Sequence, residues 1–412
     1  MKVLIVSGIW PPDVGGPASH APEVAEWLRE RGHEVEAVVT AGSAPAPEDY
    51  PVRFASRSLP PGVRHAAALR LIVARARQVD VVYSTGMFGR SSLGAFLART
   101  PLVLKLTADP AFERARRRGL VAGEVGDFQA GGGGLLAGIL RRARDAAVAR
   151  AAHIVCPSAF MRELVVSWGV PGERVTLLPN SAPRVTDAAA FDPGPRPVLA
   201  FAGRLTAQKD LGVALAALRE LDGVRLLIAG DGPERERLEA AAGDRVEFLG
   251  PLPRARVLGL LAAADAAILT SAWENFPHGV VEALAVGTPV IATRTGGVAE
   301  VVVDGENGLL VEPGDTRAFI EAVRRYLGDA DLQARLRAAA VPSVAAYDAD
   351  AVYVQLEAIL QKAAHRGVGS TEPRKERRRR LGRRGSGNRG VGSTEPRKER
   401  RRRLGRRGSG NP

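Results

Sequence analysis

Two cationic side chains, Arg204 and Lys209, lie in the stretch GRLTAQK, which directly follows the apolar run Val198–Ala202. An arginine offers a planar fork of donors and a lysine a point charge, and both bind phosphate oxygens. On a turn between a strand and a helix, the two side chains could reach one diphosphate. The alternative is a pair of solvated surface charges, which a glycine-anchored turn after a buried strand disfavours.

Two carboxylates, Glu274 and Glu282, frame the sequence ENFPHGVVE. Pro277 suits the first turn of a helix, so Glu274 precedes this helix and Glu282 lies about one and a half turns inside it. Carboxylates accept paired hydrogen bonds from sugar hydroxyls, which suits these two to a hexose and a ribose. Stabilisation of the helix dipole by Glu274 and a solvated position for Glu282 are the alternatives. His278 could contact a phosphate or be an ordinary surface histidine.

Two glycine pairs follow expected strands and precede expected helices. They are Gly15-Gly16, after the first strand, and Gly296-Gly297, after Thr293. Glycines in such places let backbone N–H groups approach an anion at the positive end of a helix. An ordinary tight turn is the alternative in both places.

The elements that must position these residues alternate between apolar strands and amphipathic helices, which predicts parallel sheets covered by helices. The strands expected are Val3–Val6, Val35–Thr40, Val81–Thr85, Leu102–Leu106, Ile154–Pro157, Val198–Ala202, Leu226–Ala229, Val246–Leu249, Ala267–Thr270 and Val290–Thr293. A helix ends near Arg31, with Gly32 as its left-handed cap. Ligands of such folds bind at the carboxyl ends of the strands, where the residues above lie.

The length of 412 residues suits two domains of ordinary size. A Pro- and Ala-rich stretch, Ala182 to Pro197, breaks the alternation and is interpreted as a linker. The sequence therefore predicts an α/β protein of two Rossmann-like, doubly wound domains that face each other across a cleft. The predicted parts are a first domain (1–183), a second domain (184–344), a C-terminal helical segment (345–365) and a basic tail (366–412).

The net charge of +13 resides in this tail. Residues 366–388 and 389–411 are identical copies, each with nine Lys/Arg and two Glu, so the pair carries +14 and the rest of the chain −1. The tail contains almost no large apolar residues and is expected to be disordered. A nucleic-acid-binding role would rest on the tail alone, and the neutral body argues against it as the main function.

Several classes of protein are disfavoured by composition. No apolar run is long enough to span a bilayer. The run that begins at Met1 stops at Ser7, which is too short for a signal peptide and indicates a buried strand. The single cysteine, Cys156, lies in an apolar run and fits a reducing compartment. A cytoplasmic location is expected, with the inner face of the membrane left open as the place of action.

The second half resembles the family 4 retaining glycosyltransferases of the GT-B fold. The resemblance rests on FAGRLTAQKD, LLIAGDGPERERLE, VEFLGPLP, ENFPHGVVEALAVGTPVIATRTGGVAEVV and GENGLLVEPGD, in this order and spacing. It implies that Arg204 and Lys209 bind the donor diphosphate, that Glu282 holds the ribose and that Glu274 acts on the transferred sugar. It further implies that Gly16 lies near the phosphates. Weaker donor contacts are expected from Gly15, Asn275, Phe276, Pro277 and His278.

One position departs from the family pattern. Many relatives carry a histidine after the strand that corresponds to Leu102–Leu106, and here Asp109 occupies that neighbourhood. An ionised aspartate can accept a hydrogen bond from a sugar hydroxyl but cannot donate one. Asp109 is therefore taken, with Glu274, as a candidate catalytic residue. No cluster has metal-ligand spacing, so no metal or other cofactor is expected.

The expected partners are a nucleotide-diphosphate sugar and an acceptor that is a glycan, a lipid-linked sugar or a small molecule. A nucleotide-sugar epimerase of the same fold is the nearest alternative. The segments Phe112–Arg118 and Leu135–Arg142 combine apolar and basic residues. Such helices can lie on anionic membranes, or they can simply cover a sheet, and both interpretations stay open here.

Overall fold

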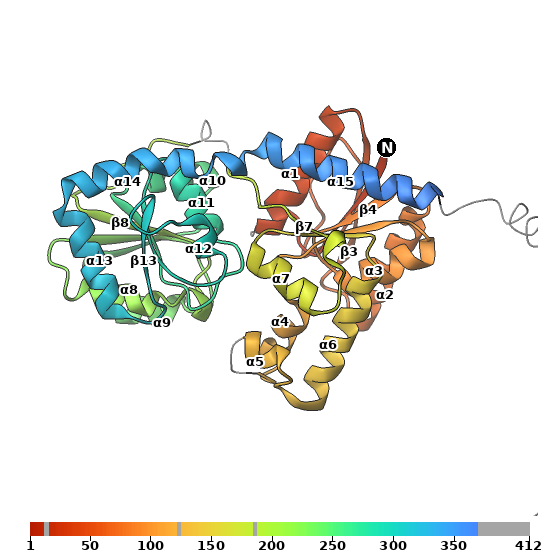
Figure 1. Ribbon diagram of the computed structural model, residues 1–412, viewed down its shortest axis with the longest axis horizontal. Helices are drawn as coiled ribbons and strands as arrows, with labels where there is room; N and C mark the ends of the chain where they lie inside the picture. The colour runs from red at the N-terminus through yellow and green to blue at the C-terminus, as the bar shows by residue number, and fades with distance from the viewer. Residues whose placement is uncertain (12–15, 122–124, 184–187, 370–412) are drawn as a thin grey trace, which may run out of the picture. The chain divides into compact units, whose positions relative to one another are not determined.

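The computed structural model describes residues 1–11, 16–121, 125–183 and 188–369. Gly15 and the repeated tail from residue 370 onward lie outside the described residues. Two parallel sheets with helices on both faces make up the body of the chain (Figure 1).

Among the described residues, seven parallel strands form the first sheet, in the order β3-β2-β1-β4-β5-β6-β7. Their bounds are β1 Lys2–Ser7, β2 Glu34–Ala41, β3 Val52–Ser56, β4 Val81–Ser84, β5 Leu102–Lys105, β6 His153–Cys156 and β7 Val175–Leu177. The central strands are buried on both faces, which is why they are continuous apolar runs rather than alternating ones.

The second sheet has six parallel strands within the described part of the chain, in the order β10-β9-β8-β11-β12-β13. They are β8 Val198–Ala202, β9 Arg225–Ala229, β10 Val246–Gly250, β11 Ala266–Leu269, β12 Val290–Thr293 and β13 Gly308–Val311. Each sheet therefore has one place where the strand order reverses, between β1 and β4 and between β8 and β11. Such reversal points are where doubly wound folds bind ligands.

The helices between the strands cover the sheets. In the first half they are α1 Gly16–Glu30, α2 Pro61–Ala76, α3 Phe88–Ala98, α4 Pro110–Arg117, α5 Val125–Gln129, α6 Gly134–Ala149 and α7 Ala159–Ser167. In the second half they are α8 Leu211–Leu218, α9 Arg235–Ala241, α10 Arg254–Ala263, α11 His278–Ala285, α12 Val298–Val301, α13 Thr316–Gly328, α14 Ala330–Ser343 and α15 Ala349–Gly369. Short 3-10 turns lie at η1 Gly172–Arg174, η3 Ala207–Lys209 and η4 Ala345–Tyr347. No helix within the described ranges is both long and apolar enough to cross a bilayer.

The last helix, α15, packs on the first sheet although it follows the second. Val352, Leu356 and Leu360 are buried in one core with strand residues such as Val3 and Ile5. Polar contacts reinforce this packing, since Glu357 accepts hydrogen bonds from Arg31 at 2.8 Å and from His33 at 2.6 Å.

Every strand expected from the sequence is present, but β3, β7 and β13 were missed. β3 and β7 are edge strands with exposed residues, so their apolar pattern is weak. The glycine cap is confirmed, because α1 ends at Glu30 and Gly32 has a φ of +81°. Helix α15 continues to Gly369, past the boundary at residue 365 where the tail was expected to begin.

Candidate functional site

The turn that carries Arg204 and Lys209 leaves β8 at the reversal point of the second sheet. The loop after β9 holds it in place: the Gly203 N–H donates to the Ala229 carbonyl at 2.9 Å and the Leu205 N–H to the Asp231 carbonyl at 3.0 Å. Arg204 is exposed and makes no ion pair with any described residue. Its guanidinium is therefore available to an anion, and backbone hydrogen bonds hold the turn that carries it.

Gly230 explains why the loops after β8 and β9 can meet. A Cβ atom at this position would lie 1.9 Å from the Gly203 carbonyl oxygen, and its φ of +138° is one that side chains rarely adopt. The GDG sequence after β9 thus supports the turn that carries Arg204.

Lys209 and Glu274, which are 65 positions apart, form an ion pair in which the Lys209 ammonium donates to Oε2 of Glu274. Both side chains are largely buried, and Ser271 Oγ donates to the same carboxylate oxygen at 3.4 Å. Because β8 and β11 are neighbours, the loops that follow them bring the expected phosphate cation against the expected sugar carboxylate. A donor that bound here would have to rearrange this pair.

The Gly296-Gly297 pair packs against the backbone of this carboxylate. A Cβ atom on Gly296 would lie 1.7 Å from the Glu274 carbonyl oxygen, and one on Gly297 would lie 2.4 Å from the Asn275 carbonyl oxygen. The two glycines therefore permit a close approach that sets the position of Glu274.

Helix α11 carries Glu282 and begins at His278, with Pro277 as its N-terminal cap residue. Arg254 lies 3.9 Å from a carboxylate oxygen of Glu282. Burial, opposed by Arg254 and reinforced by Glu23, raises the pKa of Glu282. A carboxylate in such surroundings is ready to accept hydrogen bonds from hydroxyl groups.

His278 is exposed, and its ring nitrogen lies 3.0 Å from Nδ2 of Asn180, a residue from the end of the first half. The pKa of His278 is lowered to about 4, first by desolvation from the surrounding protein atoms and then by the charges of Lys105, Lys209 and Arg254. The imidazole is therefore neutral at neutral pH. Of the cations that act on it, Lys209 is paired with Glu274 and Arg254 lies near Glu23 and Glu282.

The other residues between Glu274 and Glu282 that were expected to contact the donor are partly or fully buried. Phe276 is buried, and its ring lies 5.3 Å from the His278 ring and 6.0 Å from that of Tyr347. Asn275 is half-buried and Pro277 is buried. Gly16 is the first residue of α1, whereas Gly15 lies outside the described residues.

Both carboxylate oxygens of Asp109 accept hydrogen bonds from other groups of the protein. Its Oδ1 accepts the N–H groups of Ala111 at 2.8 Å and Phe112 at 3.2 Å, which caps α4. Its Oδ2 accepts from Gln129 at 2.7 Å and from Arg144 at 2.5 Å. The side chain is buried, so a contact between Asp109 and a sugar would require this network to open; the catalytic role of Asp109 stays a prediction.

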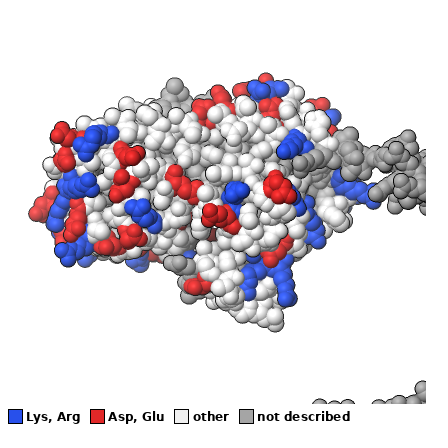
Figure 2. Space-filling view, in the orientation of Figure 1, with Lys and Arg blue, Asp and Glu red and all other residues white. Residues whose placement is uncertain are grey.

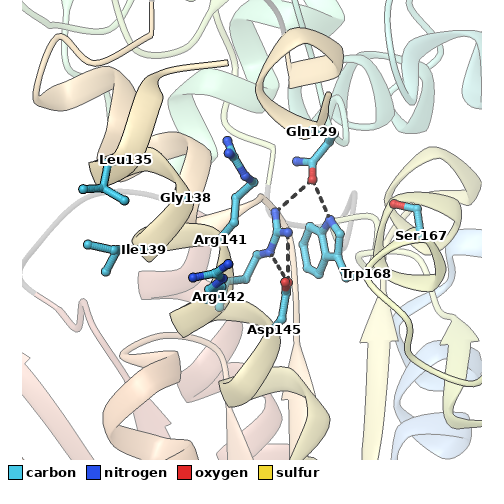
Figure 3. Close-up of a pocket in the computed structure, with 10 residues that line it drawn as sticks. Gln129, Leu135, Gly138, Ile139, Arg141, Arg142, Asp145, Ser167 and Trp168 are labelled. Atoms are coloured by element: carbon cyan, nitrogen blue, oxygen red, sulfur yellow. Dashed lines mark hydrogen bonds and ion pairs between the residues drawn. The ribbon is translucent and has the colours of Figure 1, made fainter. Parts of the chain in front are cut away.

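Arg144, which pairs with Asp109, lines a cavity of about 630 Å³ together with other residues of α6. Gln129, Asp145 and Trp168 lie around this site (Figure 3). The Arg144 guanidinium is 4.0 Å from the Trp168 ring centre, and the Trp168 N–H donates to Gln129 at 3.2 Å.

Asp109→Ala is expected to lower the free energy of unfolding by about 3–5 kcal/mol, because it removes a helix cap and leaves Arg144 buried without its main partner. Urea unfolding measures this. Asp145→Ala is the matched control: Asp145 pairs with the same arginine but is 40% exposed, so a loss under about 1 kcal/mol is expected. A stable Asp109→Ala variant with little turnover would instead support a direct contact with the substrate.

The sequence did not single out three side chains that interact with Glu282 or His278. They are Asn180, Arg254 and Lys105. Lys105 had a usable signal, since it is a charged residue that ends an apolar strand. Asn180 and Arg254 carry no such signal, because only the fold brings them to α11.

Comparison with known proteins follows the two halves of the chain. Residues 15–181 match the model of a glycosyl transferase 4-like domain, and residues 187–341 match that of glycosyl transferases group 1. A GDP-mannose-dependent alpha-mannosyltransferase of Mycobacterium tuberculosis is 30% identical over 76% of this chain and 85% of its own length. The glycogen synthase of the same organism is 29% identical over 91% of this chain and 97% of its own length.

Solved structures show the same fold. Anabaena Alr3699/HepE in complex with UDP-glucose superposes with a TM-score of 0.72 at 21% identity, over 88% of this chain and all of that one. Sucrose-phosphate synthase of Thermosynechococcus elongatus also gives 0.72, at 20% identity, over 88% of this chain and 98% of that one. The arrangement of the two sheets is therefore that of the GT-B fold.

Proposed function

The chain belongs to the group 1 glycosyltransferases, and from this we propose that it transfers a hexose from a nucleotide-diphosphate sugar to an acceptor hydroxyl, with retention at the anomeric carbon. The observation that carries the proposal is the contact between Lys209 and Glu274 at the β8–β11 reversal point. The Lys209 ammonium can bind the phosphate of a sugar–phosphate bond, and the Glu274 carboxylate can accept a hydrogen bond from the sugar.

The mechanism follows from charge. When the bond between the anomeric carbon and the phosphate oxygen breaks, its electron pair stays on the diphosphate and the sugar becomes oxocarbenium-like. Arg204 and Lys209 would stabilise the leaving group, and Glu274 would hold a sugar hydroxyl close to the positive carbon. The acceptor oxygen then forms the new bond, and its proton passes to the departing phosphate. Attack from the same face as the leaving group is what the family implies.

We propose that no metal ion takes part, because two protein cations lie where the leaving-group charge develops. The acceptor is proposed to be a glycan or a lipid-linked sugar of the cell envelope. A cytoplasmic location stays a prediction.

Acidic and basic side chains are mixed over the face shown in Figure 2, which fits the near-neutral body and disfavours a general nucleic-acid-binding surface.

The test is a donor screen with UDP-, GDP- and ADP-linked glucose and mannose, each with and without candidate acceptors and with EDTA. Release of nucleoside diphosphate that requires an acceptor and survives EDTA is the expected result. Conversion of the donor sugar without any acceptor would identify the epimerase alternative. Activity that EDTA abolishes and magnesium or manganese restores would reject the metal-free mechanism.

We further propose that α6 places the enzyme on an anionic membrane surface. Leu135, Leu136 and Ile139 on this helix are 80%, 57% and 52% exposed, so they do not cover the sheet. Helix α4 packs beside α6, and exposed arginines lie on α4 (Arg114 and Arg117), directly after it (Arg118) and on α6 (Arg142). An apolar face bordered by arginines complements an anionic bilayer. Figure 3 shows Leu135 and Ile139 on one side of α6.

Replacing Leu135, Leu136 and Ile139 together with serine is expected to weaken binding to phosphatidylglycerol vesicles about 10³-fold or more, because each buried side chain contributes roughly 1.5–3 kcal/mol. Vesicle sedimentation at low and high salt measures this. Val354→Ser, at a similarly exposed apolar position on α15, is the control. Equal binding by both variants would contradict the assignment of this surface.

A further inference from the structure

A lysine is buried at the carboxyl edge of the first sheet. Lys105 ends β5 and is 3% exposed. Its Nζ lies 3.2 Å from Nε2 of His20, a residue of α1, and the same imidazole nitrogen lies 3.0 Å from the hydroxyl oxygen of Tyr83 in β4. Strands β4 and β5 and helix α1 thus bring a phenol, a cation and an imidazole together next to the β1–β4 reversal point.

Among the residues that the structure describes, the charge of Lys105 has no counter-ion. None of the ion pairs among the described residues includes it, and its one hydrogen-bond partner there is an uncharged ring. The carboxylate that acts on it electrostatically, Glu23, is engaged elsewhere, with the Tyr353 hydroxyl at 3.0 Å and Arg254 at 3.8 Å. A buried ammonium without a partner is costly. Burial accordingly lowers the pKa of Lys105 to about 7, against the weaker opposing effect of Glu23.

Helix α1, which carries His20, is linked to the candidate donor residues of the second half, because Arg254 lies 3.8 Å from Glu23 of α1 and 3.9 Å from Glu282. The positive charges that depress the pKa of His278 are those of Lys105, Lys209 and Arg254, with Lys105 the largest of the three. Lys105 also acts on His20, whose pKa burial lowers well below its ordinary value. Both histidines are therefore neutral, and the positive charge of this region belongs to the lysines and the arginine.

We propose that Lys105, positioned by His20 and Tyr83, is the first sheet's phosphate-binding residue and makes a direct ion pair with a substrate phosphate. The inference rests on the proposed function and adds a residue to the same site. Nε2 of the neutral imidazole accepts from the ammonium and shares its lone pair with the Tyr83 hydroxyl, which leaves two N–H bonds of Lys105 for phosphate oxygens. The phosphate is assigned to the donor diphosphate, because Arg254 contacts both Glu23 of α1 and Glu282, the expected ribose-binding residue.

The first experiment is calorimetric titration of Lys105→Met with UDP, GDP and ADP, and separately with glucose 6-phosphate. Methionine keeps the length of the side chain and removes the charge. The nucleoside diphosphate that wild type binds is expected to bind about 10- to 100-fold more weakly. Lys362→Met, at an exposed position of α15, is the matched control and should leave the affinity unchanged.

The second experiment uses the wild type, so it does not depend on the variant folding. The titratable groups around Lys105 are His20, which contacts it, and Glu23 and His278, which interact with it electrostatically. Tyr83 and Tyr353 lie next to the His20 ring. The pKa values of the two histidines are lowered and those of the two tyrosines are raised, so these four keep their protonation near pH 8. An anion stabilises the charged lysine and raises its pKa above about 7, so binding at pH 8 should take up protons and weaken as the pH rises further.

Titrations in buffers of different ionisation enthalpy measure this proton uptake, and the nucleotide's own protonation is subtracted with Lys105→Met. Weaker nucleotide binding together with lost uptake supports the assignment to the donor. A loss confined to glucose 6-phosphate would keep the phosphate site but move it to a phosphorylated acceptor. Unchanged affinities and no proton uptake in wild type would overturn the proposal. If wild type binds no nucleoside diphosphate at all, it is the proposed function that fails.

Discussion

Arg204→Ala is expected to weaken nucleoside-diphosphate binding roughly 10- to 150-fold, which corresponds to the roughly 1.5–3 kcal/mol of one charge-assisted hydrogen-bonded contact. The side chain is exposed and free of ion pairs within the described structure, so its removal should not change the free energy of unfolding. Calorimetric titration gives the affinity, and thermal melting checks the fold.

Lys209→Ala is expected to cause a loss of similar size together with a loss of stability, because it leaves the buried Glu274 carboxylate without its partner. The matched controls are Arg317→Ala, whose side chain is 89% exposed, and Lys362→Ala. If both Arg204→Ala and Lys209→Ala keep wild-type affinity and turnover, the diphosphate is bound elsewhere.

Glu274→Gln is expected to lower kcat by roughly 10²- to 10³-fold, the size of effect seen when a group that stabilises transition-state charge is removed. Nucleotide affinity should be equal or slightly tighter, because the substitution frees Lys209 from its ion pair. Glutamine keeps the shape of the side chain and can still contact Ser271. A lower kcat would therefore be due to the lost negative charge and not to altered packing.

Glu282→Gln should behave differently, since the ribose is present in the free nucleotide. We expect about tenfold weaker binding of the nucleoside diphosphate and a smaller change in kcat. Steady-state kinetics with the intact donor, alongside titration with the free nucleotide, separate the two carboxylates. Glu321→Gln, at an exposed ion pair, is the control. Identical behaviour of the Glu274 and Glu282 variants would refute the division of their roles.

The sequence by itself determined the class of fold. Strands that are buried on both faces must be continuous apolar runs, and helices that cover them must be amphipathic, so the alternation was readable without coordinates. It also singled out as candidates the turn of Arg204 and Lys209 and the stretch that begins at Glu274, because glycines and charges that follow a buried strand are unusual. The edge strands β3 and β7 were missed because they contain exposed residues, which weakens their apolar pattern.

Only the tertiary structure decided which of these residues meet. The order of parallel strands depends on contacts between segments far apart in the chain, and no local pattern records that β8 lies beside β11. The Lys209–Glu274 pair and the surroundings of Lys105 follow from that order. Asp109 illustrates the same limit: its position after β5 suggested chemistry, yet Gln129 and Arg144, which occupy its carboxylate, come from later helices. A side chain's role depends on its neighbours, and in a doubly wound protein most neighbours are distant in sequence.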